Sequence, residues 1–192
     1  MQYAALGASD TTGIGASPLT NGYVYKIRDG IETSGMSTNL MNYGIPDIEI
    51  QGIRDEELVL LDHGHKPDVV TLFVGVNDII AGASASHFET ELTAILNHLN
   101  KIDGAKVYIA DLPDLTQIPR FKDKPDNDVT FARVQEFNNI IYQQAAAFNA
   151  NVIYLSSDAA DDNLVSDDGL HPNSKGYQRI ADLFLQQILP RL

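Results

Sequence analysis

The chain contains no cysteine and no tryptophan among its 192 residues, and only 13 lysines and arginines stand against 26 aspartates and glutamates. Without cysteine it forms no disulfide, holds no zinc through thiolates and uses no cysteine nucleophile. The formal net charge of −13 disfavours nucleic acids and anionic membrane surfaces as partners, because both are bound through clustered basic side chains. The same charge predicts that anionic substrates are repelled.

Long hydrophobic runs are also missing. No apolar stretch approaches the roughly 18 residues that suggest a membrane span, and we expect none. The first residues, from Met1 to Leu6, lack the basic segment of a signal peptide and are typical of a strand. They predict a cytoplasmic protein if the chain is complete and an extracytoplasmic one if a leader was removed. The apolar residues, 44% of the chain, suffice for one domain spanning 1–192 with a single sizeable core.

Short apolar segments alternate with amphipathic segments along the chain. Strands are predicted at residues 3–6, 40–43, 67–74, 106–110 and 152–155. Helices are predicted at residues 23–31, 54–63, 87–102, 129–148 and 173–189. This alternation predicts parallel βαβ units and a five-stranded α/β sandwich. In such a sheet, ligands bind at the carboxyl ends of the strands, where the strand order switches direction.

Candidate catalytic groups follow the predicted strands. Ser9 comes after the first strand, Gly44 after the second and Asn77 after the third. Asp168 and His171 come after the last strand, three residues apart. A serine becomes a nucleophile when a neighbouring base removes its proton, and imidazole titrates near neutral pH. We therefore predict that His171 activates Ser9 and that Asp168 orients the imidazole.

The sequence around these residues resembles the SGNH, or GDSL-type, hydrolase family. The motifs that carry the resemblance are Leu-Gly-Ala-Ser at Ser9, Asn-Tyr-Gly-Ile at Gly44, Gly-Val-Asn-Asp at Asn77 and Asp-Gly-Leu-His-Pro from Asp168 to His171. The resemblance covers residues 7–176 and implies a flavodoxin-like, three-layer α/β/α sandwich with strand order 2-1-3-4-5. It also implies the three catalytic roles given above and an oxyanion hole formed by Ser9, Gly44 and Asn77.

The first motif departs from the Gly-Asp-Ser-Leu of the family. Ala8 stands where the family has an acid, and Asp10 stands where it has a leucine. Loss of the acid removes a group that could support the oxyanion loop, and Asp10 places a charge beside Ser9. Because the nucleophile itself remains, the predicted reaction class is unchanged.

Two apolar stretches are predicted as walls of the substrate site. Residues 112–129 contain three prolines and form a longer connection than most, which either lines the site or is a disordered surface insertion. Residues 79–83 form the second wall. Their apolar and small side chains suit a short or medium acyl chain. The candidate substrate-binding residues are Ile79, Leu115, Ile118 and Phe121.

Other kinds of site fit the sequence less well. Thr11 occupies the position of the last glycine in a Gly-x-Ser-x-Gly nucleophile elbow, and the glycines after the first strand lack dinucleotide-binding spacing. His63 and His65 have no third ligand at helical spacing. The acidic residues between 158 and 167 lack the EF-hand calcium pattern. We therefore expect no cofactor and no metal.

These features predict a serine ester hydrolase. It would cleave short- to medium-chain acyl esters through an acyl-enzyme on Ser9, and its partner would be a small-molecule ester. The sequence leaves open an acyl-thioesterase or a carbohydrate deacetylase of the same mechanism, and also a non-catalytic binding protein on the same fold. It gives no oligomeric state.

Overall fold

In a computed structural model that describes residues 1–157 and 160–192, the strands form one five-stranded parallel sheet. The strand order is β2-β1-β3-β4-β5, as the resemblance implied. The strands are β1 (Gln2–Gly7), β2 (Asn39–Asn42), β3 (Val69–Phe73), β4 (Lys106–Ala110) and β5 (Asn151–Ile153). The fold class predicted from the sequence is thus confirmed.

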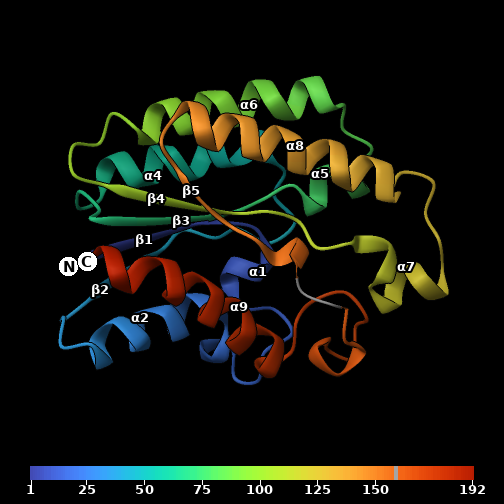
Figure 1. Cartoon of the computed structure of the whole chain (residues 1–192), viewed down its shortest axis with the longest axis horizontal. Helices are drawn as coiled ribbons and strands as arrows, with labels where there is room; N and C mark the ends of the chain where they lie inside the picture. The colour runs from blue at the N-terminus through green and yellow to red at the C-terminus, as the bar shows by residue number, and fades with distance from the viewer. Residues whose placement is uncertain (158–159) are drawn as a thin grey trace.

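Helices cover both faces of the sheet (Figure 1). On one face lie α2 (Tyr23–Thr33) and α9 (Ser174–Ile188), which pack against each other. On the other face lie α3 (Ile50–Gly52), η2 (Ile53–Glu57), α4 (Leu58–His63), α6 (Ala85–Leu99) and α8 (Phe131–Ala147). None of the helices in the described part of the chain is both long and apolar enough to cross a bilayer.

The core consists of the apolar residues that the geometry of each strand or helix places on its inward side. All five residues of β3 are buried, and its β-branched side chains suit a strand that is covered on both faces. Along α9, one stripe of the helix is buried, with Tyr177, Ala181, Phe184 and Ile188 spaced three or four residues apart. The ring of Phe184 stacks on that of Tyr23 in α2, with centroids 5.4 Å apart. These contacts fix the two helices against the sheet.

Several boundaries differ from those predicted. A one-turn helix, α1 (Ser9–Thr12), interrupts the expected loop after β1. The helix expected at 54–63 begins earlier, at Ile50, and contains one turn of π-helix, η2. The connection at 112–129 is folded, with the turn η3 (Leu115–Gln117) and the helix α7 (Pro119–Asp123). Short polar turns of this kind have no repeating hydrophobic pattern from which they could be predicted.

The edge that carries the candidate residues lies at the switch in strand order. β1 and β3 are neighbours, and Gly7 at the end of β1 pairs with Phe73 at the end of β3. The chain leaves β1 toward β2 on one side and returns to β3 on the other. The helices that start just beyond these ends, α1 and α5 (Val76–Ile80), therefore begin beside each other.

Candidate active site

Ser9, His171 and Asp168 form a hydrogen-bonded chain across this edge. The Ser9 Oγ lies 2.8 Å from the His171 Nε2, although the two residues are 162 positions apart in the sequence. The His171 Nδ1 lies 2.7 Å from the Asp168 Oδ2. The fold thus brings together the three residues predicted as nucleophile, base and orienting acid.

The Asp168 carboxylate is held in its ionised form. Its Oδ1 accepts hydrogen bonds from the backbone amides of Leu170, at 2.8 Å, and His171, at 2.9 Å. Burial raises the pKa of Asp168, but these amides and the His171 ring outweigh that effect, so the pKa lies well below its usual range. An ionised Asp168 accepts the proton of Nδ1, which leaves the Nε2 lone pair free to accept the Ser9 hydroxyl.

A closed loop presents His171 to Ser9. The Ser166 amide donates to the His171 carbonyl at 2.8 Å, and the Asn173 amide donates to the Leu164 carbonyl at 2.8 Å. The Asn173 side chain also caps α9, since its Oδ1 accepts from the amides of Lys175 and Gly176. The last helix and the base are therefore anchored by the same short stretch of chain.

Asn77 lies in the first turn of α5 and lines the same cavity as Ser9 and His171. Its Nδ2 donates to the Ile48 carbonyl at 2.9 Å. A side-chain amide has two N–H groups, so one remains for a ligand in the cavity. The Ser9 amide, at the first position of α1, has no partner within its helix. Ser9 and Asn77 thus bring two hydrogen-bond donors to the same cavity.

The amide of Gly44, the third predicted oxyanion donor, is paired with a side chain. It donates to the Asn42 Oδ1 at 3.0 Å, and the residue does not line the cavity. A Cβ at this position would approach the Thr11 side chain to 2.8 Å, so the glycine is required for close packing of the two loops. The structure therefore places Gly44 beside α1, with its amide already paired.

Asp78 holds the loop that carries Asn77. This buried carboxylate accepts the Ile50 amide, at 3.1 and 3.2 Å from its two oxygens. Burial raises its pKa to about 6. Because Ile50 begins α3, this contact ties the turn that carries Asn77 to the neighbouring helix.

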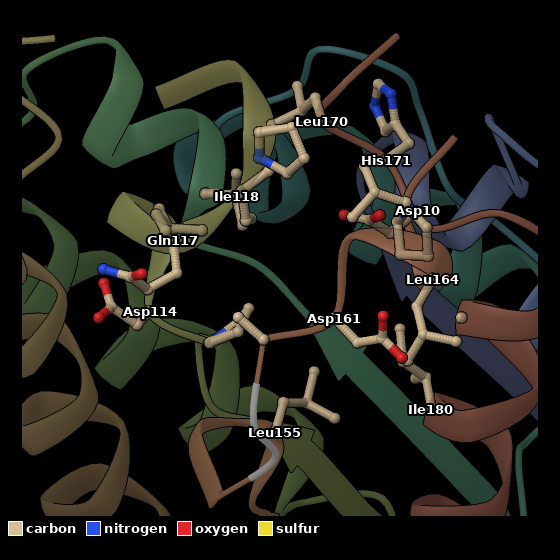
Figure 2. Close-up of a pocket in the computed structure, with 18 of the residues that line it drawn as sticks. Asp10, Asp114, Gln117, Ile118, Leu155, Asp161, Leu164, Leu170, His171 and Ile180 are labelled. Carbon is tan, nitrogen blue, oxygen red and sulfur yellow. The ribbon is translucent and has the colours of Figure 1, made fainter. Parts of the chain in front are cut away.

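A cavity of about 360 Å³ opens beside Ser9, Asn77 and His171. Its volume falls within the usual range for small-molecule sites, at the lower end. Figure 2 shows Ile118 and Leu170 on one side, Leu164 and Ile180 on another, and Leu155 at the far end. The leucine and isoleucine side chains that line it are Leu115, Ile118, Leu155, Leu164, Leu170 and Ile180, and Phe73, Val76 and Val165 add further apolar surface.

Two of the four predicted substrate-binding residues do not line this cavity. Leu115 and Ile118 do line it, whereas Ile79 and Phe121 are buried in the core. Both are on short helices, α5 and α7, whose apolar side packs inward against the sheet layers. Three lining residues that the sequence did not single out are Leu155, Leu164 and Ile180. Their contribution depends on how the chain after β5 folds back, which no local pattern reveals.

Asp10 places a carboxyl group in the cavity wall. It receives a hydrogen bond from the Tyr177 hydroxyl at 3.3 Å, and that hydroxyl also bonds the Ile14 carbonyl at 2.5 Å. Burial raises the pKa of Asp10, while the nearby His171 ring opposes the shift. Tyr177 projects from α9, stacks on Tyr23 of α2 and donates to Asp10 through its hydroxyl.

Within residues 1–157 and 160–192, no three His, Asp or Glu side chains lie close enough together to hold a metal ion. Asp158, one of the acids considered for calcium, lies outside the described residues.

The comparison with protein families agrees with this geometry. The model of the GDSL-like lipase/acylhydrolase family matches residues 5–179. The chain belongs to this family. It is therefore an esterase/lipase-type hydrolase, as its motifs had indicated.

Two curated proteins are similar to this chain in sequence. A multidomain esterase of Ruminococcus flavefaciens is 29% identical over 131 residues, which are 65% of this chain and 16% of that protein. The chain thus spans only a small part of that relative. The spore germination lipase LipC of Bacillus licheniformis is 24% identical over 95% of this chain and 93% of its own length.

Solved structures share the fold of this hydrolase. The acetyl xylan esterase AlAXEase is 26% identical, with a TM-score of 0.75, over 98% of this chain and all of that one. TesA superposes with a TM-score of 0.82 over the full length of both chains at 19% identity, which supports the fold alone.

Proposed function

We propose that this hydrolase cleaves short- to medium-chain acyl esters through an acyl-enzyme on Ser9. The observation that carries the proposal is the unbroken chain of hydrogen bonds from the Ser9 Oγ to His171 and on to Asp168, at 2.8 and 2.7 Å. This arrangement is that of an activated serine nucleophile.

In the acylation step, the Ser9 Oγ forms a bond to the ester carbonyl carbon while its proton moves to the His171 Nε2. The carbonyl oxygen becomes an oxyanion, which the Ser9 amide and the free N–H of Asn77 stabilise. The bond to the alcohol oxygen then breaks, and His171 returns the proton to the leaving alcohol. Asp168 stabilises the imidazolium that exists between these two transfers.

Water completes the cycle. His171 takes a proton from a water molecule, whose oxygen attacks the acyl carbon of the Ser9 ester. The carboxylic acid leaves, and the proton on Nε2 returns to the Ser9 Oγ. Gly44 remains the predicted third oxyanion donor, which requires its amide to exchange the Asn42 partner for the substrate oxygen.

The shape of the cavity favours an acyl chain of more than two carbons. Leucine and isoleucine side chains line the cavity that Ser9 faces, and apolar surface of this kind binds methylene groups. Carboxyl groups at Asp10, Asp114 and Asp161 also line the cavity. They disfavour acyl groups or alcohols that carry negative charge.

Carbohydrate deacetylation is the second candidate. The similarity to the acetyl xylan esterase AlAXEase supports it, at 26% identity over nearly the whole chain. An acetyl group would leave most of the apolar cavity unfilled, so the cavity favours the first candidate.

The decisive experiment measures hydrolysis of p-nitrophenyl esters from acetate to dodecanoate and, in parallel, release of acetate from acetylated xylan. We expect kcat/KM to rise from acetate to a medium chain and then fall, and we expect Ser9→Ala to abolish turnover of every substrate. Wild-type turnover in Ser9→Ala would contradict the proposed nucleophile. A preference for acetylated xylan over all p-nitrophenyl esters would favour deacetylation.

A further inference from the structure

A buried glutamate contacts the backbone just before the nucleophile, and no sequence motif indicated it. Glu57, the last residue of η2, is fully buried, and its Oε2 accepts the Gly7 amide at 2.9 Å. Gly7 is the last residue of β1, two positions before Ser9. The carboxyl group thus reaches from one helical layer to the strand end from which the nucleophile is presented.

The sheet itself leaves the Gly7 amide without a backbone acceptor. β2 ends at Asn42, and beyond it the Ile45 amide donates to the Gly7 carbonyl at 3.1 Å. The Gly7 amide lies on the same side of β1 as its carbonyl, but it donates to the Glu57 carboxyl group and not to a backbone carbonyl. A buried amide needs an acceptor, so the side chain of Glu57 takes the place of the missing neighbour strand.

Gly7 transmits this contact to the catalytic loop because it has little freedom of its own. It adopts φ +143°, and a Cβ here would collide with the Phe73 carbonyl oxygen and the Thr11 hydroxyl. The Cα of Gly7 is therefore closely packed between the end of β3 and α1. A shift in the Gly7 amide moves the start of α1, and with it the Ser9 amide and Oγ.

We propose that Glu57 is a positioning residue for the nucleophile, replacing in this chain the support that an acid at position 8 could give. The inference rests on the proposed serine mechanism and adds to it the group that fixes the Ser9 loop. The side chain of Ala8 cannot form a hydrogen bond to the chain around Ser9, whereas the Glu57 carboxyl group accepts one from the Gly7 amide. What matters in this role is the reach of an acceptor oxygen to Gly7, and a neutral amide oxygen can provide it as well as a carboxyl.

The test therefore separates reach from acidity. Glu57→Gln keeps an oxygen at the same distance, Glu57→Asp keeps the acid but shortens it by one methylene, and Glu57→Leu removes both. The matched controls are Glu91→Gln, Glu91→Asp and Glu91→Leu. Glu91 is also nearly buried and pairs with Arg54 at 2.6 Å, but its partner is on the helical layer alone.

The readouts are kcat, KM and the rate at which a fluorophosphonate labels Ser9, together with a thermal melt of each variant. We expect kcat and labelling rate to fall about tenfold or more in Glu57→Asp and Glu57→Leu, with KM little changed, because a small misplacement of a reacting group is costly. Glu57→Gln should lose much less than either, and the Glu91 variants should keep wild-type labelling rates.

Equal labelling rates in folded Glu57→Asp and Glu57→Gln would overturn the proposal. It is also overturned if neither Glu57→Asp nor Glu57→Leu folds while Glu57→Gln does, since the side chain of Glu57 would then serve the fold as a whole. Failure of the proposed function looks different, because in that case the wild type itself is neither labelled nor more active than Ser9→Ala.

Discussion

Ser9 and His171 meet at 2.8 Å, but the chain holds them by different means. Ser9 is 6% exposed and follows a central strand, and its surroundings are fixed by Glu57 and Asn77 from distant segments. His171 sits in a surface loop, where its partner Asp168 has a side chain that is 41% exposed. The nucleophile side depends on the tertiary structure, whereas the base side is largely built within three residues.

The difference has a physical reason. The oxyanion donors must be fixed before the charge develops, and a buried network of packed segments fixes them most firmly. The imidazole must accept and release protons, and its carboxylate partner stays ionised most easily where solvent is near. We therefore expect changes on the base side to reduce activity alone, and changes on the nucleophile side to reduce activity and stability together.

The largest expected effect comes from removing the base. His171→Ala should lower kcat by about 10⁶-fold, because Ser9 then has no acceptor for its proton. The melting temperature should stay close to that of the wild type. Steady-state kinetics and a thermal melt of the same preparation measure both quantities. A large loss of stability would contradict the view that the base side is locally held.

Asp168→Asn should come next, with kcat reduced by about 10⁴-fold. The asparagine oxygen can still accept the Leu170 and His171 amides, but its NH₂ group donates to Nδ1 and so places the ring proton on Nε2. Because the site is half exposed, the free energy of unfolding should change by no more than about 0.5 kcal/mol. Chemical denaturation checks the stability, and a pH–rate profile checks the loss of activity at every pH.

Asn77→Ala tests the nucleophile side. It removes an oxyanion donor and should lower kcat by about 10²-fold with little change in KM. It also leaves the Ile48 carbonyl without its partner, so the free energy of unfolding should fall by about 1 kcal/mol. The matched control is Asn138→Ala, which removes a buried amide bound to the backbone of Leu112, away from Ser9. A loss seen mainly in KM would contradict the oxyanion role.

A smaller effect is expected from a change in the cavity wall. Ile180→Phe fills part of the apolar space beside Leu164 and should move the optimum of the p-nitrophenyl ester series toward shorter chains. The change in kcat/KM for the longest ester should be about tenfold, which is the discrimination that one or two methylene groups provide. The acetate ester should be hydrolysed as by the wild type. Ile140→Phe, outside this cavity, is the control, and an unchanged chain-length optimum in Ile180→Phe would show that the acyl chain binds elsewhere.

The pH dependence of stability sharpens the comparison most finely. Burial raises the pKa of Glu57 from 4.5 to about 8, while the amides of Gly7 and Ile45 oppose the shift and the charge of Glu56 adds to it. Between these values the folded chain keeps a proton that the unfolded chain has released. The stability that the folded chain gains from keeping Glu57 protonated is therefore fully present below pH 4.5. It is lost as the pH rises from 4.5 toward about 8, by about 1.4 kcal/mol per pH unit.

Glu57→Gln removes this loss, so its stability relative to the wild type should increase as the pH rises from 5 to 8. Denaturant unfolding at each pH measures the difference. A parallel pH dependence in the two proteins would show that Glu57 is already ionised in the folded chain.

Much of the fold and the base side could be predicted from the sequence. The unbroken apolar run of β3 and the period of α6 and α9 are local signals, because burial on one or two faces imposes them directly on neighbouring residues. Asp168 and His171 lie three residues apart, so a single tight loop suffices to pair them.

Which way individual side chains point was decided only by the tertiary structure. Ile79 and Phe121 look like cavity residues in the sequence, but their helices turn them into the core. Glu57 reads as one acid among several on a helix, and only the end of β2 at Asn42 makes it the partner of Gly7. Contacts between segments that are far apart in the sequence leave no repeating pattern in the chain, because each contact depends on the folded position of both segments.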